Sequence, residues 1–79
     1  MTHTVLLPDI GETIDEGVVE EWLVEIGDEV EKGEPILTVE VDKATLEVAA
    51  TAEGVLVRQL VHVEQAVRTG DPLAEIDEA

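Results

Sequence analysis

Short apolar runs alternate with turn-forming residues along the whole chain, a pattern typical of β-strands joined by tight connections. Valine, isoleucine, leucine and threonine dominate the runs, while glycine, proline and acidic residues separate them, as in EIGDE, EKGEP and TGDP. We therefore predict strands at 4–7, 17–24, 35–41, 44–50, 54–61 and 73–77, with short bridges near Val30 and Val67. The glutamates of 18–26 are compatible with a helix, but the alternation there favours a strand.

The pattern of residues 17–40 is repeated at 54–77, a shift of 37 positions. Turn and strand residues stay in step, with Gly17 aligned with Gly54, Gly33 with Gly70, and Pro35 with Pro72. Two copies are too few for a solenoid, so we expect them to pack on each other about a pseudo-two-fold axis. The predicted fold class is all-β, a small antiparallel sandwich or flattened barrel, because closure removes exposed strand edges.

A two-residue loop at Asp42-Lys43 fits the pattern on either side of it. With this loop, Val41 pairs with Ala44, Val39 with Leu46 and Leu37 with Val48, which makes one continuous apolar inner face. The intervening residues Thr38, Glu40, Thr45 and Glu47 then point outward. Such loops favour residues that tolerate positive φ, and lysine adopts that conformation at a cost of about 1 kcal/mol. Lys43 is therefore a functional candidate, and an ordinary exposed loop lysine is the alternative.

The repeat also predicts where this hairpin lies. A shift of 37 relates position 43 to position 6 in one direction and to a position beyond residue 79 in the other. The counterpart of the loop is therefore the gap between the chain ends. We expect Lys43 at one tip of the domain and both termini near the opposite tip, an arrangement that suits a reactive group on a tethered carrier.

Composition and charge exclude several classes of function. The 79 residues suffice for one small domain, and 20 acidic residues against four basic ones give a net charge of −16. Nucleic acids and anionic membranes would repel such a surface. The acidity is compatible with a highly solvated surface, with steering toward basic clefts on partner proteins, or with a high-salt source.

Catalytic and metal-binding patterns are absent from the sequence. It contains no cysteine, and His3 and His62 lack neighbours at metal-ligand spacing, so we predict no disulfide and no metal site. No nucleophile–base pair or phosphate-binding glycine loop is evident, which disfavours a free-standing enzyme. No apolar run approaches the roughly 20 residues that span a membrane. Without a signal or transit peptide, we expect a prokaryotic cytoplasmic protein, with the mitochondrial matrix less favoured.

The segments LPDIGETIDEG, EEWLVEIGDEVEKGEPI and EVDKATLEV, followed by Gly54, closely resemble the lipoyl domains of 2-oxoacid dehydrogenase complexes. The resemblance covers about Val5 to Ile76 and implies two four-stranded antiparallel sheets. We expect a single domain over residues 1–79, monomeric in isolation and the N-terminal part of a longer dihydrolipoyl acyltransferase, because AEIDEA ends where a linker would begin; a carrier domain fused to another subunit is the alternative. The resemblance also implies that Lys43 carries lipoate as an amide, forming a swinging arm.

The same resemblance implies partners and further site residues. A lipoate ligase or lipoyl transferase would load the arm, and a thiamine-diphosphate-dependent 2-oxoacid decarboxylase would acylate it. An acyltransferase core would pass the acyl group to coenzyme A, and an FAD-containing dihydrolipoyl dehydrogenase would reoxidise the arm. Recognition of the loop is assigned to Asp42 and Ala44, with Glu40 and Glu47. Docking on the decarboxylase is assigned to the loop from about Asp9 to Glu16, including Asp9, Ile10, Gly11, Glu12 and Thr13.

Alternatives remain within and outside this family. A biotinyl carrier domain shares the fold, but methionines typically flank its lysine, whereas Asp42 and Ala44 flank Lys43 here. The glycine-cleavage carrier also bears a lipoyl-lysine but is considerably longer. An unmodified β interaction module is the alternative from another class, and Asp42 and Glu47 are then ordinary turn and surface residues. Val41, the segment AATAEG and the pair Glu64-Gln65 depart from the usual lipoyl pattern, which leaves the particular complex, and hence the acyl group, unassigned.

Overall fold

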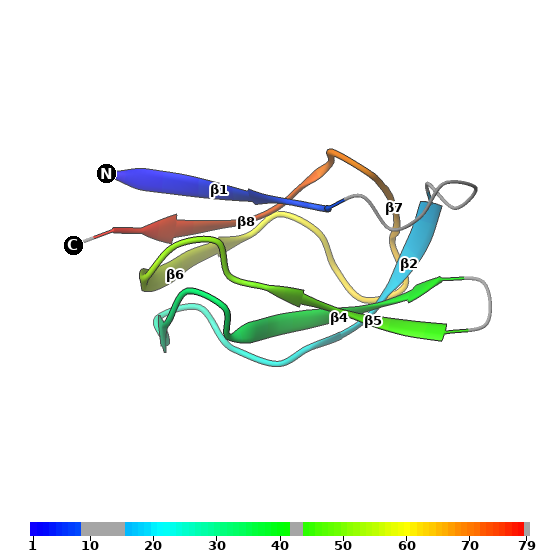
Figure 1. Ribbon diagram of the computed structural model, residues 1–79, viewed down its shortest axis with the longest axis horizontal. Coiled ribbons are helices and arrows are strands. Elements are labelled where there is room, and N and C mark those ends of the chain that lie inside the picture. The colour runs from blue at the N-terminus through cyan, green and yellow to red at the C-terminus, as the bar shows by residue number, and fades with distance from the viewer. Residues whose placement is uncertain (9–15, 42–43, 79) are drawn as a thin grey trace.

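The computed structural model describes residues 1–8, 16–41 and 44–78, and the regular elements within them are all strands. Eight strands follow one another along the chain: β1 (Thr2–Leu6), β2 (Glu16–Trp22), β3 (Glu29–Val30), β4 (Pro35–Val41), β5 (Ala44–Ala49), β6 (Gly54–Gln59), β7 (Ala66–Arg68) and β8 (Pro72–Asp77). They form two four-stranded antiparallel sheets, ordered β1-β8-β6-β3 and β5-β4-β2-β7 (Figure 1). The all-β prediction is confirmed as a sandwich; over the described ranges the strand pairing does not close into a barrel.

Each predicted strand is present, but two of them end two residues earlier than the pattern suggested. The predicted strands 17–24 and 54–61 end at Trp22 and Gln59. Beyond these points the chain turns inward, so that Val61 is buried and Val24 packs against the core. The apolar residues at 24 and 61 therefore belong to the core without belonging to a strand, which explains why the alternation ran past the strand ends.

The two sheets repeat each other strand by strand, which confirms the pseudo-two-fold relation. β4 lies between β5 and β2, just as β8 lies between β1 and β6. The turns before β3 and β7 make matching hydrogen bonds: the Gly27 amide donates to the Leu56 carbonyl and the Glu64 amide to the Val19 carbonyl, each at 2.7 Å. Each of these residues lies 37 positions from its counterpart.

Side chains from both inner faces fill the space between the sheets. The core contains mostly valine, leucine and isoleucine, which suits short twisted strands. Among the described residues its fully buried members are Val5, Leu7, Val19, Val30, Ile36, Leu37, Val39, Val48, Leu56, Val67, Leu73, Ala74 and Ile76. Trp22 covers one side of this core, and its indole Nε1 donates to the Val61 carbonyl at 3.1 Å.

Glu64 adopts a backbone conformation with positive φ, whereas glycine occupies the matching position in the other half of the chain. Glu64 has φ of 74°, and Gly27 in the matching turn has φ of 100°. Within the described ranges Glu64 is the one non-glycine residue with positive φ. A left-handed conformation disfavours a residue with a Cβ atom, so the second turn is strained where the first is not.

Replacing Glu64 with glycine is expected to stabilise the domain by about 0.5–1 kcal/mol. Relief of the left-handed conformation contributes about 1–2 kcal/mol, and the greater backbone entropy of unfolded glycine offsets about 0.5–1 kcal/mol of it. Urea unfolding of the purified domain measures the difference. The control is Gly27→Glu, where a Cβ atom has open space around it and only the backbone conformation is penalised, so stability should fall. Equal stability of the wild type and both variants would contradict the strain argument.

Candidate functional site

The predicted hairpin register is confirmed. Val41 pairs with Ala44, Val39 with Leu46 and Leu37 with Val48 along the β4–β5 ladder. The two residues between these strands, Asp42 and Lys43, lie outside the described residues. The pairing of Val41 with Ala44 nevertheless makes their connection a two-residue loop, as the sequence pattern required.

The inner face of the hairpin is continuous on β4 but not on β5. Leu37, Val39 and Val41 are all buried, whereas on β5 only Val48 is buried, Leu46 is half-buried and Ala44 is exposed. β5 is the edge strand of its sheet, so its end near Ala44 extends beyond the core. The hairpin is therefore anchored through β4 and projects at its tip.

On the outer face, Glu40, Thr45 and Glu47 are exposed as predicted, but Thr38 is buried. The Thr38 hydroxyl donates at 3.4 Å to Glu20 Oε1 and lies 3.5 Å from the Glu21 carbonyl oxygen on β2. The neighbouring strand covers Thr38, a long-range effect that alternation along β4 does not reveal. Of the residues assigned to loop recognition, Glu40, Ala44 and Glu47 thus lie together on exposed parts of one hairpin.

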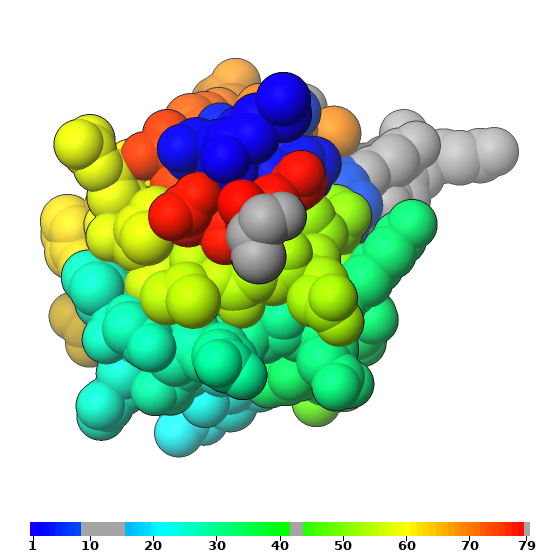
Figure 2. Space-filling view, turned by 90° about the vertical axis from the view of Figure 1, so that its left-hand side faces the viewer, coloured from blue at the N-terminus to red at the C-terminus, as the bar shows by residue number. Residues whose placement is uncertain are grey.

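The hairpin and the chain ends lie at opposite tips, as the repeat predicted (Figure 1). The molecule measures 37 × 21 × 17 Å, and its long axis separates these two ends. At the terminal tip the Glu78 amide donates to the Met1 carbonyl at 2.7 Å, the counterpart of the Val41–Ala44 pair. Figure 2 shows this tip face-on, with the β1 and β8 segments side by side.

The predicted docking loop, including Asp9, Ile10, Gly11, Glu12 and Thr13, lies outside the described residues. Its two flanks lie beside the end of β7 and the turn that follows β7. On the first flank the Leu7 amide donates to the Asp71 carbonyl at 2.9 Å. On the second, Glu16 forms an ion pair with Arg68 at 3.4 Å. The loop therefore begins and ends beside residues 68–71.

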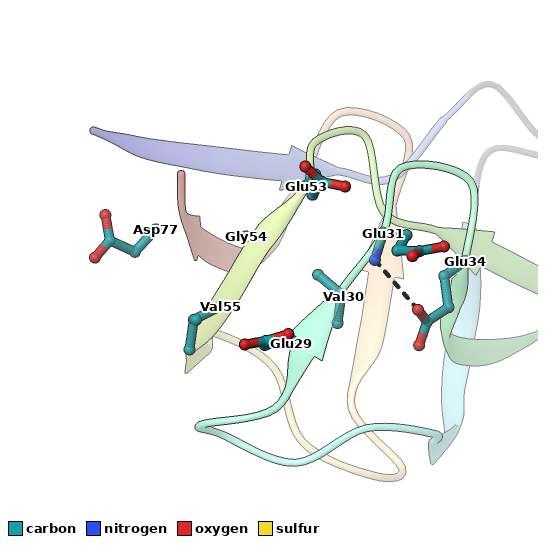
Figure 3. A pocket seen from close by; sticks show the side chains of 8 residues that line it. All are labelled: Glu29, Val30, Glu31, Glu34, Glu53, Gly54, Val55 and Asp77. Carbon is teal, nitrogen blue, oxygen red and sulfur yellow. Dashed lines mark hydrogen bonds between the residues drawn. The ribbon is translucent and has the colours of Figure 1, made fainter. Parts of the chain in front are cut away.

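A hollow of about 390 Å³ lies at the terminal tip, and no residue of β4 or β5 lines it. Figure 3 shows the acidic side chains that line it, with the Glu34 carboxylate accepting the Glu31 amide at 3.2 Å. Its lining residues are Glu29, Val30, Glu31, Glu34, Glu53, Gly54, Val55 and Asp77. Nowhere in the described residues do three or more histidine or acidic side chains meet in a metal-binding arrangement. Across those same residues there is also no helix long and apolar enough to cross a membrane.

A smaller hollow of about 290 Å³ lies beside β4 where the projecting tip of the β4–β5 hairpin begins, and the sequence pattern did not predict it. We call it the hairpin-base hollow; it is lined by Val18, Val19, Glu20, Glu40, Val63 and Glu64. The available signal was the alignment of Glu64 with Gly27 across the repeat, which marked an unusual turn residue. The sequence did not show that this turn lies beside β2, where the Val19 amide donates to the Gln65 carbonyl at 2.9 Å.

The sequence matches a known family and relatives within it. The family described as "Biotin-requiring enzyme" matches residues 3–76. The dihydrolipoyllysine-residue succinyltransferase component of the 2-oxoglutarate dehydrogenase complex of Staphylococcus saprophyticus is 39% identical over 94% of this chain and 18% of its own length. The dihydrolipoyllysine-residue acetyltransferase component of the pyruvate dehydrogenase complex of Corynebacterium glutamicum is 36% identical over 100% of this chain and 12% of its own. The chain thus spans less than a fifth of either relative.

Two solved structures have a fold similar to that of this chain. The lipoyl domain of the 2-oxoglutarate dehydrogenase complex from Azotobacter vinelandii is 31% identical, with a TM-score of 0.74 and 95% of both chains covered. The urea carboxylase of Kluyveromyces lactis has a TM-score of 0.84 at 23% identity, covering 98% of this chain and 6% of that one, and shows likeness of fold alone. With the hairpin, the repeat and these relatives together, the chain belongs to the biotin- and lipoyl-attachment family, as a lipoyl domain of the 2-oxoacid dehydrogenase acyltransferase type.

Proposed function

We propose that Lys43 carries lipoate through an amide bond and that the domain presents this arm to the enzymes of a 2-oxoacid dehydrogenase complex. The observation that carries the proposal is the β4–β5 register, in which Val41 and Ala44 leave Asp42-Lys43 as a two-residue loop. That loop connects strands at the tip opposite the chain ends. Attachment of lipoate through an amide bond requires a lysine amine, and a lysine in such a loop supplies one.

The described residues suit this cargo. Buried Leu37, Val39 and Val41 hold β4 in the sheet, so the loop is carried on a supported ladder. When bound, lipoate would supply a disulfide that takes up the acyl group and two electrons left by 2-oxoacid decarboxylation and is restored by two-electron oxidation after acyl transfer to coenzyme A. The chain has no cysteine, so it offers no thiol of its own to compete in this exchange.

The partners follow from this chemistry and belong to the same proposal. They are a thiamine-diphosphate-dependent decarboxylase, an acyltransferase core, an FAD-containing dihydrolipoyl dehydrogenase and a lipoate-attaching enzyme. We further propose that the chain is one domain of a longer acyltransferase in a prokaryotic cytoplasm, supported by its short coverage of the two bacterial relatives. Tethering a carrier to such a core raises its effective concentration at each active site.

Expression with lipoate and a lipoate ligase tests the attachment. Intact-protein and peptide mass spectrometry are expected to show one lipoyl adduct, located on Lys43. The matched control is Lys32, an exposed lysine in the turn before Gly33, which should stay unmodified. An unmodified Lys43, equal labelling of Lys32, or loading by a biotin ligase in place of the lipoate ligase would contradict the proposal.

A further inference from the structure

We propose that the hairpin-base hollow is a docking surface for a basic segment with an apolar projection at the active-site entrance of the 2-oxoacid decarboxylase. This inference rests on the proposed function, because it names the surface through which one partner recognises the carrier. The hollow lies outside the predicted docking loop and outside the loop that bears Lys43. It combines apolar walls, a carboxylate rim and a strained residue.

The hollow adjoins the hairpin directly. Glu40, which forms one side, lies on β4 three positions before Lys43 and pairs with Val18 on β2. The opposite side comes from the 62–65 turn, which the Glu64 amide fixes to the Val19 carbonyl at 2.7 Å. A partner seated here would therefore contact β4 close to the loop that bears Lys43 and would touch both halves of the chain.

The walls of the hollow are apolar side chains left open to solvent. Val18 is 42% exposed and Val63 is 47% exposed, while Val19 forms a buried floor between them. Val63 also borders a second hollow that includes Trp22 and Leu60. Two adjoining hollows with a shared apolar wall extend the contact surface along the 60–65 segment, a shape that fits a protein partner better than a small molecule.

The rim of the hollow carries three carboxylates, Glu20, Glu40 and Glu64. Among the described residues, no basic side chain lines the hollow and no ion pair involves any of the three. Carboxylates are common on this surface, so they alone do not single the hollow out. Together with exposed valines, they are complementary to a partner that offers lysine or arginine around an apolar side chain.

The internal repeat allows the rim of this hollow to be compared with the equivalent positions in the other half of the structure. The positions equivalent to Glu20 and Glu64 are Val57 and Gly27 at the terminal tip. Two of the three rim carboxylates therefore occur only at the hairpin end of an otherwise repeated structure. Glu64 is held there with φ of 74°, although glycine fits the same turn without strain. Backbone strain of this kind clusters at functional sites, and here it coincides with a carboxylate on the rim of the hollow.

The decarboxylase is the partner that this surface fits best. It meets the carrier in every turnover, whereas lipoate is attached once, so electrostatically steered association benefits the decarboxylase encounter most. An enzyme that admits an anionic 2-oxoacid also gains from a positive potential at its entrance. That potential would attract the rim carboxylates of the carrier as well.

The test compares lipoylated domains as substrates for reductive acylation. The decarboxylases of the pyruvate and 2-oxoglutarate complexes from the source genome are assayed with their own 2-oxoacids, and mass spectrometry follows acetyl or succinyl transfer. With the enzyme that acylates the wild type fastest, the double variant Glu20→Gln/Glu64→Gly is expected to lower kcat/KM about tenfold, mainly through KM. Its dependence on salt concentration should also weaken. Because Glu64→Gly relieves strain, a folding defect is not expected.

A matched double variant controls for net charge. Glu29→Gln/Glu53→Gln also removes two negative charges, but from the hollow at the terminal tip, and this variant should be acylated like the wild type. Unchanged acylation of the hairpin-base variant, or an equal loss in the control, would overturn the inference. A loss confined to the rate of lipoate attachment would assign the surface to the lipoate-attaching enzyme and overturn the choice of partner. A wild type that takes no lipoate on Lys43 would instead overturn the proposed function and this inference with it.

Discussion

Replacing Lys43 with arginine is expected to abolish both lipoate attachment and reductive acylation. A guanidinium keeps the positive charge but does not supply the amine that forms an amide with lipoate. The loop joins strands held by the buried residues Leu37, Val39 and Val41, so the fold should not depend on this side chain. Intact-mass analysis and an acylation assay measure the loss, and urea unfolding should give a stability within about 0.5 kcal/mol of the wild type.

The control for this variant is Lys32→Arg, which removes the other lysine of the chain. It should be lipoylated and acylated at wild-type rates. Residual lipoate on Lys43→Arg would mean that attachment is not specific to this position. Loss of folding would instead mean that the lysine is structural, which would remove the reason for proposing a carrier.

Replacing Gly54 with alanine is expected to destabilise the domain by about 3 kcal/mol, the upper range for overpacking a closely packed site. An added Cβ atom would clash with the Asp77 carbonyl oxygen and lie 2.9 Å from Ile76 Cγ2 on β8. β8 lies between β1 and β6, so its backbone is held from both sides and has little freedom to withdraw. Thermal unfolding should show the midpoint lowered by about 12 °C or more, since a domain of this size loses about 4–8 °C for each kcal/mol.

The repeat supplies the matched variant, Gly17→Ala. Its added Cβ atom would lie 2.5 Å from Val39 Cγ1 and 2.9 Å from Val41 Cγ1, both side-chain methyl groups, and the equivalent backbone carbonyl oxygen, that of Glu40, would be 3.0 Å away. Valine side chains can shift more readily than a backbone carbonyl, so the destabilisation should be smaller than for Gly54→Ala. The reverse order, or no effect at Gly54, would show that the strand backbones adjust more freely than their pairing suggests.

Local patterning was sufficient for the strands and for the hairpin register. Apolar residues at alternate positions excluded a one-residue slip between β4 and β5, because a slip would place Val39 opposite a polar residue. The internal repeat then located the hairpin relative to the chain ends without any knowledge of the sheets. The register depends on residues that are neighbours in the sequence, and the placement of the hairpin depends on the 37-residue repeat. Both can be read directly from the sequence.

Features created by distant segments were not predictable in this way. The alternation along β4 predicts that Thr38 points outward, yet β2 covers it and the Glu20 carboxylate accepts a hydrogen bond from its hydroxyl. Glu64 was noted as a departure from the usual pattern, but its strain and its place beside Glu40 follow only from the packing of the 62–65 turn on β2. The hairpin-base hollow exists because three segments meet there, and no single segment indicates it.

The shared fold also explains why shape alone does not choose the cargo. The chain superimposes on part of a urea carboxylase as well as on a lipoyl domain, although only the latter is above 30% identical. The sandwich provides a supported hairpin at one tip, and under the proposed function the residues of the loop would decide which enzyme attaches a group to Lys43. Asp42 and Ala44 flank Lys43 here, so substitutions at these two positions would test whether the neighbours of the lysine decide which attaching enzyme accepts the loop.

The placement of β8 has a consequence for the kinetics of folding. β8 is an inner strand of its sheet, and it pairs with β1 from the other end of the chain, as Thr2 does with Asp77. That sheet cannot form until the last residues are available, so folding must overcome the closure entropy of nearly the whole chain. The β4–β5 hairpin needs only neighbouring residues, and such hairpins form within about 1–10 μs. Assembly is therefore expected to begin at the hairpin that carries the attachment loop and to finish where the two ends of the chain meet.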